Sequence, residues 1–291
     1  MKFGIHLSIA GSLESAAWKA RQLRADAFQI FSSSPRMWRE STPAADDIAA
    51  MKTVMTRYSI GPLVIHDNYL INLASGDAVI REKSIAAFRG ELQRAEMLGA
   101  AYLVAHPGSW KRLTPELGMT NIASGLAEAT AGLGRLGVTL LLECTAGQGF
   151  TLGSRLEELR DIRMMASRGM ALRIQFCLDT CHLSAAGYDV ASAEGLERTV
   201  DEVESCLGLE NVPVIHANDS KGALGSHLDR HTHIGKGQIG MEGFARILQH
   251  AAFQDKVFIL ETPVEREGDD RRNLAMLRRL AGQRSRLPLR S

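Results

Sequence analysis

Eight short runs of branched and aromatic residues recur along this chain, and they constrain its fold more than any other feature of the sequence. The runs are FGIHL (3–7), AFQIF (27–31), PLVIH (62–66), AYLVAH (101–106), VTLLLE (138–143), IQFCLD (174–179), VPVIHAN (212–218) and KVFILE (256–261). Continuous apolar runs of this length are typical of strands buried on both faces, as in parallel sheets.

Segments with helical periodicity separate these runs. The clearest covers residues 80–100, with Gly99 as its stop signal and an apolar stripe formed by Ile85, Phe88, Leu92, Ala95 and Leu98. From the third run onward the strands end 36 to 45 residues apart, the length of one strand–helix unit with its loops. We therefore predict a single (β/α)8 TIM barrel over residues 1–282, with the active site at the carboxyl ends of its strands, and a basic, flexible tail over 283–291.

Composition narrows the class of protein. The chain has 34 basic and 33 acidic residues, a net charge of +1, so it lacks the basic excess of many nucleic-acid-binding proteins. No stretch approaches the roughly 18 consecutive apolar residues of a membrane span, and the opening MKFGIHLS resembles a strand more than a secretory signal. The cysteines, at positions 144, 177, 181 and 206, lack the paired spacing of a disulfide framework. We expect a cytoplasmic protein with no membrane partner.

Side chains of metal-binding type end the last six predicted strands. They are His66, His106, Glu143, Asp179, His216 and Glu261. Residues at the carboxyl ends of barrel strands point into the active-site mouth, and carboxylates buried together there repel one another unless cations lie among them. Imidazoles mixed with carboxylates suit zinc or a neighbouring transition metal better than magnesium, which prefers oxygen ligands.

Two further segments extend this set. In CLDTCH (177–182), His182 lies three residues beyond Asp179 and is close enough to face the same mouth. In HLDRHTH (227–233), alternation along an extended segment would place His227, Asp229, His231 and His233 on one face. Spacing alone leaves open which of these four bind metal. Thiolate ligands are not expected: we predict that Cys181 is a small buried residue and that strand alternation turns Cys144 away from the site.

The ordered set of motifs resembles endonuclease IV, the bacterial-type zinc-dependent abasic-site nuclease. The motifs are HDNYLINLA (66–74), AHPGS (105–109), ECTAGQG (143–149), LDTCH (178–182), HANDSK (216–221), DRHTHIGKGQIG (229–240) and LETP (260–263). They span the chain from the first strand to the last. Each motif is weak by itself, whereas their order is specific.

The resemblance implies three metal ions, mainly Zn²⁺, with Mn²⁺ possible at one position. His66, His106 and Glu143 would hold the first ion. Glu143 would bridge to a second ion held by Asp179, His216 and Glu261. A third would be held by His182, Asp229 and His231, which would leave His227 and His233 with structural roles.

The resemblance also implies residues that contact DNA. Arg36, in FSSSPRMW (31–38), and Tyr69 with Leu70 match the side chains that this family inserts at the lesion. Two positions depart from the family pattern. The serine run 32–34 replaces a lysine usual in the loop after the second strand, and Cys144 replaces an asparagine usual after Glu143. The first departure affects phosphate contact, and the second lies beside the metal site.

The expected reaction is hydrolysis of the phosphodiester 5′ to an abasic site in double-stranded DNA, leaving a 3′-hydroxyl and a 5′-deoxyribose phosphate. Removal of 3′-blocking groups is expected as well, and the protein is expected to act as a monomer. Zinc lowers the pKa of bound water to about 7, so a three-metal site has hydroxide at neutral pH, which the catalytic residues Glu143 and Glu261 would orient. Three zinc ions among four carboxylates leave a surplus of about two positive charges in the site. This local charge would attract the phosphate even though the net charge of the whole chain is close to zero.

Two other functions remain open on these residues. A metal-dependent sugar isomerase or epimerase can share this barrel and its metal-binding mouth, and fold alone does not separate the two. The set His182, Asp229 and His231, together with HDNYLINLA, favours the nuclease, because a proton shuttle on a small sugar does not require them. A DNA-binding barrel without catalysis is the third alternative, although it would leave a full ligand set without a role.

Overall fold

The computed structural model describes residues 1–38, 42–167 and 170–282. Within these residues, eight parallel strands close into a barrel in which each strand hydrogen-bonds to a neighbour on both sides. In order around the barrel they are β1 (Lys2–His6), β2 (Ala27–Phe31), β3 (Leu63–His66), β4 (Tyr102–Ala105), β5 (Thr139–Glu143), β6 (Arg173–Asp179), β7 (Val214–His216) and β10 (Val257–Leu260), which pairs again with β1. The predicted (β/α)8 TIM barrel is confirmed. The predicted tail over 283–291 lies outside the described residues.

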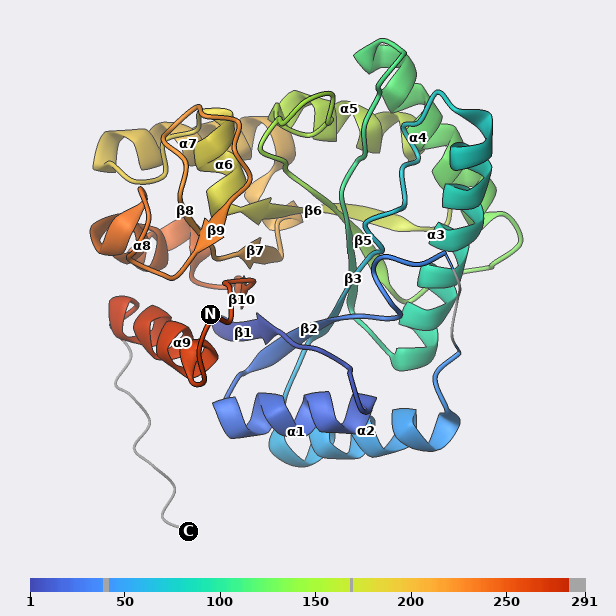
Figure 1. Cartoon of the computed structure of the whole chain (residues 1–291). Helices are drawn as coiled ribbons and strands as arrows, with labels where there is room; N and C mark the ends of the chain where they lie inside the picture. The colour runs from blue at the N-terminus through green and yellow to red at the C-terminus, as the bar shows by residue number, and fades with distance from the viewer. Residues whose placement is uncertain (39–41, 168–169, 283–291) are drawn as a thin grey trace.

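Helices form an outer ring around these strands (Figure 1). They are α1 (Leu13–Leu23), α2 (Ala45–Tyr58), α3 (Ala78–Leu98), α4 (Pro115–Thr130), α5 (Leu156–Ala166), α6 (Thr180–Ala186), α7 (Ala193–Leu207), α8 (Gly240–Gln249) and α9 (Asp269–Leu280). Short 3-10 turns, η1 (Leu209–Asn211) and η2 (Ala251–Phe253), precede β7 and β10. No helix in the described parts of the chain is long and apolar enough to cross a membrane.

The ends of α3 show how local sequence sets the element boundaries. The helix begins two residues before the predicted start at residue 80, because the carboxylate of Asp77 accepts hydrogen bonds from the backbone N–H groups of Val79 and Ile80 at 3.0 and 3.1 Å. It ends where Gly99 takes up a left-handed conformation, with φ of 73°, so the predicted stop is confirmed.

Side chains alternate along the strands between the barrel interior and the helices. One buried cluster is built from small or branched residues of neighbouring strands, two of them from β10: Ala27, Val64, Val104, Leu141, Cys177, Val214, Val257 and Ile259. Residues between these positions, such as Phe28 and Ile65, belong to the larger core that includes the helices. Gly4 must be glycine, because a Cβ atom there would lie 2.5 Å from Cδ1 of Ile259 and 2.7 Å from the carbonyl oxygen of Ala27.

A two-stranded hairpin forms a second sheet, separate from the barrel sheet. Its strands β8 (Asp219–Ser220) and β9 (His231–Thr232) pair antiparallel between β7 and α8 in the chain. The carboxylate of Asp219 is fully buried and accepts hydrogen bonds from the backbone N–H groups of Gly235, Gly237 and Ile239 at 2.9 to 3.0 Å. This carboxylate therefore fixes the chain that follows His231.

Candidate metal centre

The six predicted strand-end residues lie at one end of the barrel. Strands β3, β5, β6 and β7 end on His66, Glu143, Asp179 and His216, respectively. The other two residues, His106 and Glu261, directly follow β4 and β10. Because all eight strands are parallel, their carboxyl ends meet at the same mouth.

Glu143 lies at the centre of this cluster and is fully buried. Its Oε2 atom is 3.2 Å from Nε2 of His66 and 3.2 Å from Nε2 of His106. Its Oε1 atom is 3.0 Å from Nδ1 of His216. One carboxylate thus belongs to two groups of potential ligands, His66–His106–Glu143 and Glu143–Asp179–His216–Glu261, in each of which the ligand atoms lie within 4.8 Å of one another. This geometry allows Glu143 to bridge two cations.

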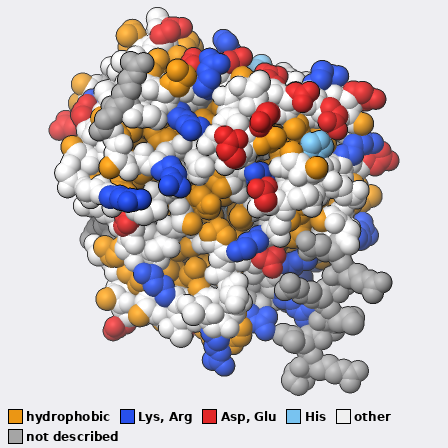
Figure 2. Space-filling view, turned by 180° about the vertical axis from the view of Figure 1, so that it is seen from behind, with side chains coloured by type: hydrophobic (Ala, Val, Ile, Leu, Met, Phe, Trp, Pro, Cys, Tyr) orange, Lys and Arg blue, Asp and Glu red, His pale blue; other side chains and the backbone are white. Residues whose placement is uncertain are grey.

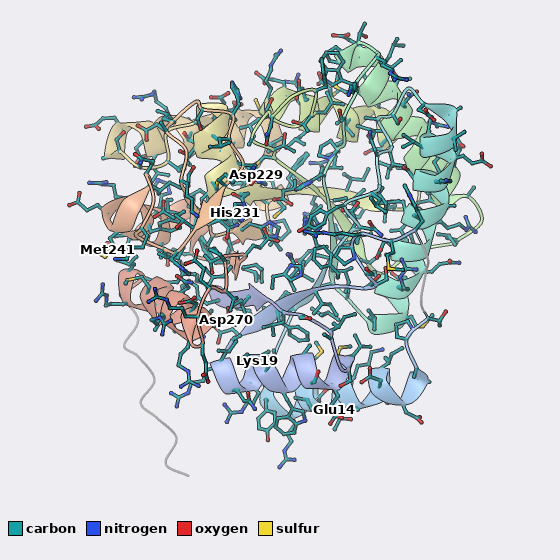
Figure 3. The ribbon with its side chains drawn as sticks, in the orientation of Figure 1. Glu14, Lys19, Asp229, His231, Met241 and Asp270 are labelled. Atoms are coloured by element: carbon teal, nitrogen blue, oxygen red, sulfur yellow. The ribbon has the colours of Figure 1, made fainter. Side chains whose placement is uncertain are left out.

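A third group is formed by His182, Asp229 and His231. Oδ1 of Asp229 lies 3.3 Å from Nε2 of His182 and 3.3 Å from Nε2 of His231. His182 reaches this position because Asp179 is the N-cap of α6, where its Oδ1 accepts the backbone N–H of His182 at 2.9 Å. Figure 3 shows Asp229 and His231 close together, with His231 in β9 and Asp229 two residues before it. All nine predicted ligands are therefore brought into three groups.

Three of the five histidines in these groups, His66, His182 and His231, hydrogen-bond through Nδ1 to a backbone carbonyl oxygen, in the manner of metal ligands. Nδ1 of His66 lies 3.0 Å from the carbonyl oxygen of Asp67, Nδ1 of His182 lies 2.9 Å from that of Cys144, and Nδ1 of His231 lies 3.3 Å from that of Glu261. A carbonyl oxygen only accepts, so each Nδ1 carries a proton, and Nε2 is the ring nitrogen that faces the cluster and would bind a metal ion. Nε2 of His231 is buried and has no hydrogen-bond partner among the described residues. A metal ion would satisfy this atom.

The electrostatics of the cluster favour positive charge. Burial would raise the pKa of Glu143, but the charges of His216 and His106 outweigh it and hold that pKa well below its usual range. Burial would lower the pKa of His182, but the charge of Asp179 and the hydrogen bond to Asp229 raise it well above its usual value. The carboxylates therefore attract cationic charge into a buried space, and a metal ion bound by neutral imidazoles would supply it.

The donor set fits zinc. Nitrogen and carboxylate oxygen atoms dominate all three groups, and each group has the three or four protein ligands that zinc sites use. Cys181 is buried, as predicted, yet its sulfur also lies within 4.8 Å of ligand atoms of Asp179 and His231. Burial raises the pKa of this thiol to about 12, so it stays protonated in the metal-free site.

The predicted common face of HLDRHTH (227–233) is wrong. His227 has a φ of 53°, so the segment is not extended at its start, and the regular alternation fails there. His227 lies with Nδ1 2.9 Å from the carbonyl oxygen of Ala146, and Nδ1 of His233 lies 3.0 Å from Nδ2 of Asn273. Neither residue belongs to the three groups, whereas Asp229 and His231 do.

Two loops beside the metal groups carry the predicted DNA-contacting residues. Arg36 is exposed in the loop after β2, Tyr69 is 57% exposed in the loop after β3, and Leu70 is half-buried next to it. Asn68 holds the two loops together, because its Nδ2 donates to the carbonyl oxygens of Ser34 and Met37 at 3.2 and 2.7 Å. The predicted residues therefore form part of one rim around the mouth.

The two departures from the family pattern lie in different surroundings. Within the serine run 32–34, Ser32 and Ser33 are buried and Ser34 is exposed. The hydroxyl of Ser32 donates to Glu91 and accepts from Nε of Arg94 at 2.7 Å, so this serine is packed against α3. Cys144 is buried and its sulfur accepts the backbone N–H of Asp179 at 3.1 Å. As predicted, Cys144 is turned away from the ligand groups, and it supports the end of β6.

Sequence reasoning missed three polar residues that contact the ligands. Nδ2 of Asn218 donates to Oδ2 of Asp179 at 2.6 Å, Nδ1 of His6 lies 3.6 Å from Oε1 of Glu261, and Nε2 of Gln29 donates to the same oxygen at 2.6 Å. Their signal was a polar side chain inside or at the end of an apolar run. Glu261 and His6 also line a pocket of about 240 Å³ together with Phe31, Tyr69, His231 and Thr262.

Comparisons with known proteins agree with this geometry. Residues 19–280 match the family of xylose isomerase-like TIM barrels. A probable endonuclease 4 of Solibacter usitatus is 55% identical to this chain, and the alignment covers 100% of both chains. A probable endonuclease 4 of Methanoculleus marisnigri is 42% identical over 96% of this chain and 98% of its own.

Solved structures give the same result. Endonuclease IV from Thermus thermophilus superposes with a TM-score of 0.85 at 39% identity, over 97% of this chain and 99% of its own. A D-tagatose 3-epimerase-like protein superposes with a TM-score of 0.71 at 22% identity, over 97% of both chains, and shares the fold. The chain therefore belongs to the endonuclease IV family of xylose isomerase-like TIM barrels, and it is a hydrolase, a nuclease of the endonuclease IV type.

Proposed function

We propose that this protein is a DNA repair endonuclease that hydrolyses the phosphodiester 5′ to abasic sites in double-stranded DNA, leaving a 3′-hydroxyl and a 5′-deoxyribose phosphate. One observation carries the proposal: His66, His106, Glu143, Asp179, His182, His216, Asp229, His231 and Glu261 form three adjoining ligand groups. The site would hold three Zn²⁺ ions, with Mn²⁺ an alternative at one position. Membership of the endonuclease IV family supports a DNA substrate.

Different ligands would have different roles in the reaction. Zinc, when bound, lowers the pKa of a coordinated water to about 7 and neutralises charge on the scissile phosphate. Glu143 and Glu261 face the same space, because Nδ1 of His216 lies 3.0 Å from Oε1 of Glu143 and 3.3 Å from Oε2 of Glu261. These two carboxylates would therefore bind metal and also orient the attacking water toward phosphorus. A metal ion held by His182, Asp229 and His231 would neutralise the negative charge of the leaving 3′-oxygen.

The rim residues recognise the lesion. An abasic nucleotide has lost stacking and pairing, so rotating it out of the duplex costs less free energy than at intact DNA. Tyr69 and Leu70 would fill the space that the missing base leaves, and Arg36 would be inserted into the DNA beside them at the lesion. The ring of Tyr69 packs against Phe31 with centroids 5.1 Å apart, so part of the wedge is held rigid before DNA arrives.

Charge on the protein surface favours binding at the mouth. Figure 2 shows the face opposite to that of Figure 1, so left and right are exchanged between the two views. Acidic side chains gather at the upper right of Figure 2, which corresponds to the upper left of Figure 1, where α7 lies. Helix α7 (AEGLERTVDEVESCL) carries five acidic residues. Such a surface repels the DNA backbone, whereas metal ions in the mouth attract it. We further propose that the enzyme removes 3′-blocking groups, acts as a monomer and works in the cytoplasm.

Incubation with a duplex oligonucleotide containing one abasic site tests the proposal, with an intact duplex and a panel of ketoses as parallel substrates. We expect one cut 5′ to the lesion, a 3′-hydroxyl that a polymerase can extend, and no change in the intact duplex or the sugars. Epimerisation of a ketose without incision of the abasic strand would establish the sugar-epimerase alternative instead.

A further inference from the structure

Gln29 is a fully buried polar side chain in the middle of β2. It lies on the same face of the strand as Ala27, which belongs to the cluster inside the barrel, so its side chain points into the barrel. A neutral amide buried at this depth is costly unless its hydrogen-bonding groups are satisfied. Strand β2 carries none of the nine candidate ligands, so the contacts of Gln29 require another explanation.

The amide of Gln29 reaches two of those ligands at once. Its Oε1 lies 2.9 Å from Nε2 of His216, and its Nε2 donates to Oε1 of Glu261 at 2.6 Å. The remaining amide hydrogen points to Nδ1 of His6, 2.9 Å away. One side chain therefore joins two members of the group Glu143–Asp179–His216–Glu261.

The carboxylate of Glu261 determines which way the amide points. An ionised carboxylate only accepts hydrogen bonds, so the NH₂ group of Gln29 faces Glu261 and its carbonyl oxygen faces His216. Nε2 of His216 must then carry the proton. A neutral imidazole has one N–H group, so Nδ1 of His216 keeps its lone pair. Nδ1 is the atom that lies 3.0 Å from Oε1 of Glu143 and 3.3 Å from Oε2 of Glu261.

We propose that Gln29 is a positioning residue of this metal group: it fixes the tautomer of His216 and the orientation of Glu261 so that both face one metal ion. The inference rests on the proposed function, because it requires that these ligands bind metal. Removal of a hydrogen-bond partner behind a metal ligand typically weakens metal affinity by roughly 10- to 100-fold. The effect is selective, because Gln29 contacts neither the group of His182, Asp229 and His231 nor His66 and His106 by any hydrogen bond described in the structure.

The chain offers a matched control. Gln175 lies in β6, and it shares a strand face with Cys177, which belongs to the same interior cluster as Ala27. Its Nε2 lies 3.5 Å from the carbonyl oxygen of Glu210, at the end of the barrel away from the ligands. Methionine replaces glutamine with little change in volume. Gln175 is half-buried whereas Gln29 is fully buried, so Gln175→Met controls for the loss of a glutamine from an inward face of the barrel that does not contact the ligands.

The experiment measures zinc content and zinc release to a chelator from the purified zinc-loaded proteins, together with the Tm of each protein after complete metal removal. We expect wild type and Gln175→Met to keep the same zinc content. We expect Gln29→Met to lose one zinc per chain at a chelator concentration roughly 10- to 100-fold lower than wild type requires, while its metal-free Tm stays close to that of Gln175→Met. Gln29→Glu is a second variant, since it keeps an acceptor for His216 but places a carboxylate against Glu261, and faster release of one zinc is expected there too.

Three outcomes separate the possible errors. Zinc release from both Gln29 variants that equals wild type would overturn the inference and leave the proposed function intact. Loss of all zinc together with a lower metal-free Tm in the Gln29 variants alone would also overturn it, because Gln29 would then be a general packing residue. Wild-type protein without bound zinc would refute the proposed metal site itself.

Discussion

Nδ1 of His216 lies 3.0 Å from Oε1 of Glu143, and both side chains are fully buried. A ring nitrogen and a carboxylate oxygen at this separation, with the other ring nitrogen hydrogen-bonded to Gln29, are two electron-pair donors facing one point. Such a pair is stable in a buried site when a cation lies between the donors. The remaining ligands extend this arrangement to three groups, and the account of function depends on it.

Replacement of Glu261 by glutamine tests the role of this carboxylate in the chemistry. We expect Glu261→Gln to lower turnover on abasic duplex by at least about 100-fold while affinity for that duplex is kept, because the change removes a negative ligand without altering the rim. The matched control is Glu265→Gln, at an exposed glutamate four residues later, which should cleave like wild type. Turnover of Glu261→Gln within tenfold of wild type, about 1.4 kcal/mol, would contradict the assignment.

Replacement of Tyr69 and Leu70 by alanine separates recognition from chemistry. Wedge and stacking contacts contribute on the order of 1–3 kcal/mol each, so we expect affinity for abasic duplex to fall by roughly tenfold to a few hundredfold. Metal content and hydrolysis of a small phosphodiester should stay close to wild type. An equal loss on both substrates, with lower thermal stability, would mean that the two residues are ordinary loop packing.

Asn68 provides a test of the link between the two recognition loops. Its Nδ2 binds the carbonyl oxygen of Met37 at 2.7 Å, and its Oδ1 accepts the backbone N–H of Leu70 at 2.8 Å. We expect Asn68→Ala to weaken binding of abasic duplex by about tenfold or more and to leave zinc content unchanged. The variant loses three hydrogen bonds of about 0.5–1.5 kcal/mol each, and DNA binding must then supply the order that these bonds give the two loops. Asn121→Ala, which removes a 3.0 Å bond to the carbonyl oxygen of Ser75, is the control. Equal binding by the two variants would show that the loops do not need this link.

Much of the site was predictable because of the parallel topology. Strands that run parallel bring their carboxyl ends together, so a His, Asp or Glu after each apolar run was enough to predict the cluster around Glu143. The segment around His227 was not predictable in this way. Its alternation assumed an extended backbone, and the φ of 53° at His227 depends on contacts such as the one to Ala146.

The positioning residues were missed for a different physical reason. Gln29 and Glu261 are 232 residues apart in the chain, and their contact depends on closure of the barrel between β10, β1 and β2. In the sequence, Gln29 is only a polar residue inside AFQIF, Asn218 is only the last residue of VPVIHAN, and Asn68 resembles an ordinary loop amide. Their roles depend on the register between strands and on the geometry of the loops, and the sequence of a single strand does not reveal either of these.

The central claim is that nine side chains hold three metal ions, with Glu143 shared by two of them. Elemental analysis of purified protein that is active on abasic duplex tests it most directly. We predict about three metal ions per chain, mainly zinc, with manganese at one position at most. One metal ion per chain, or none, in fully active protein would contradict it.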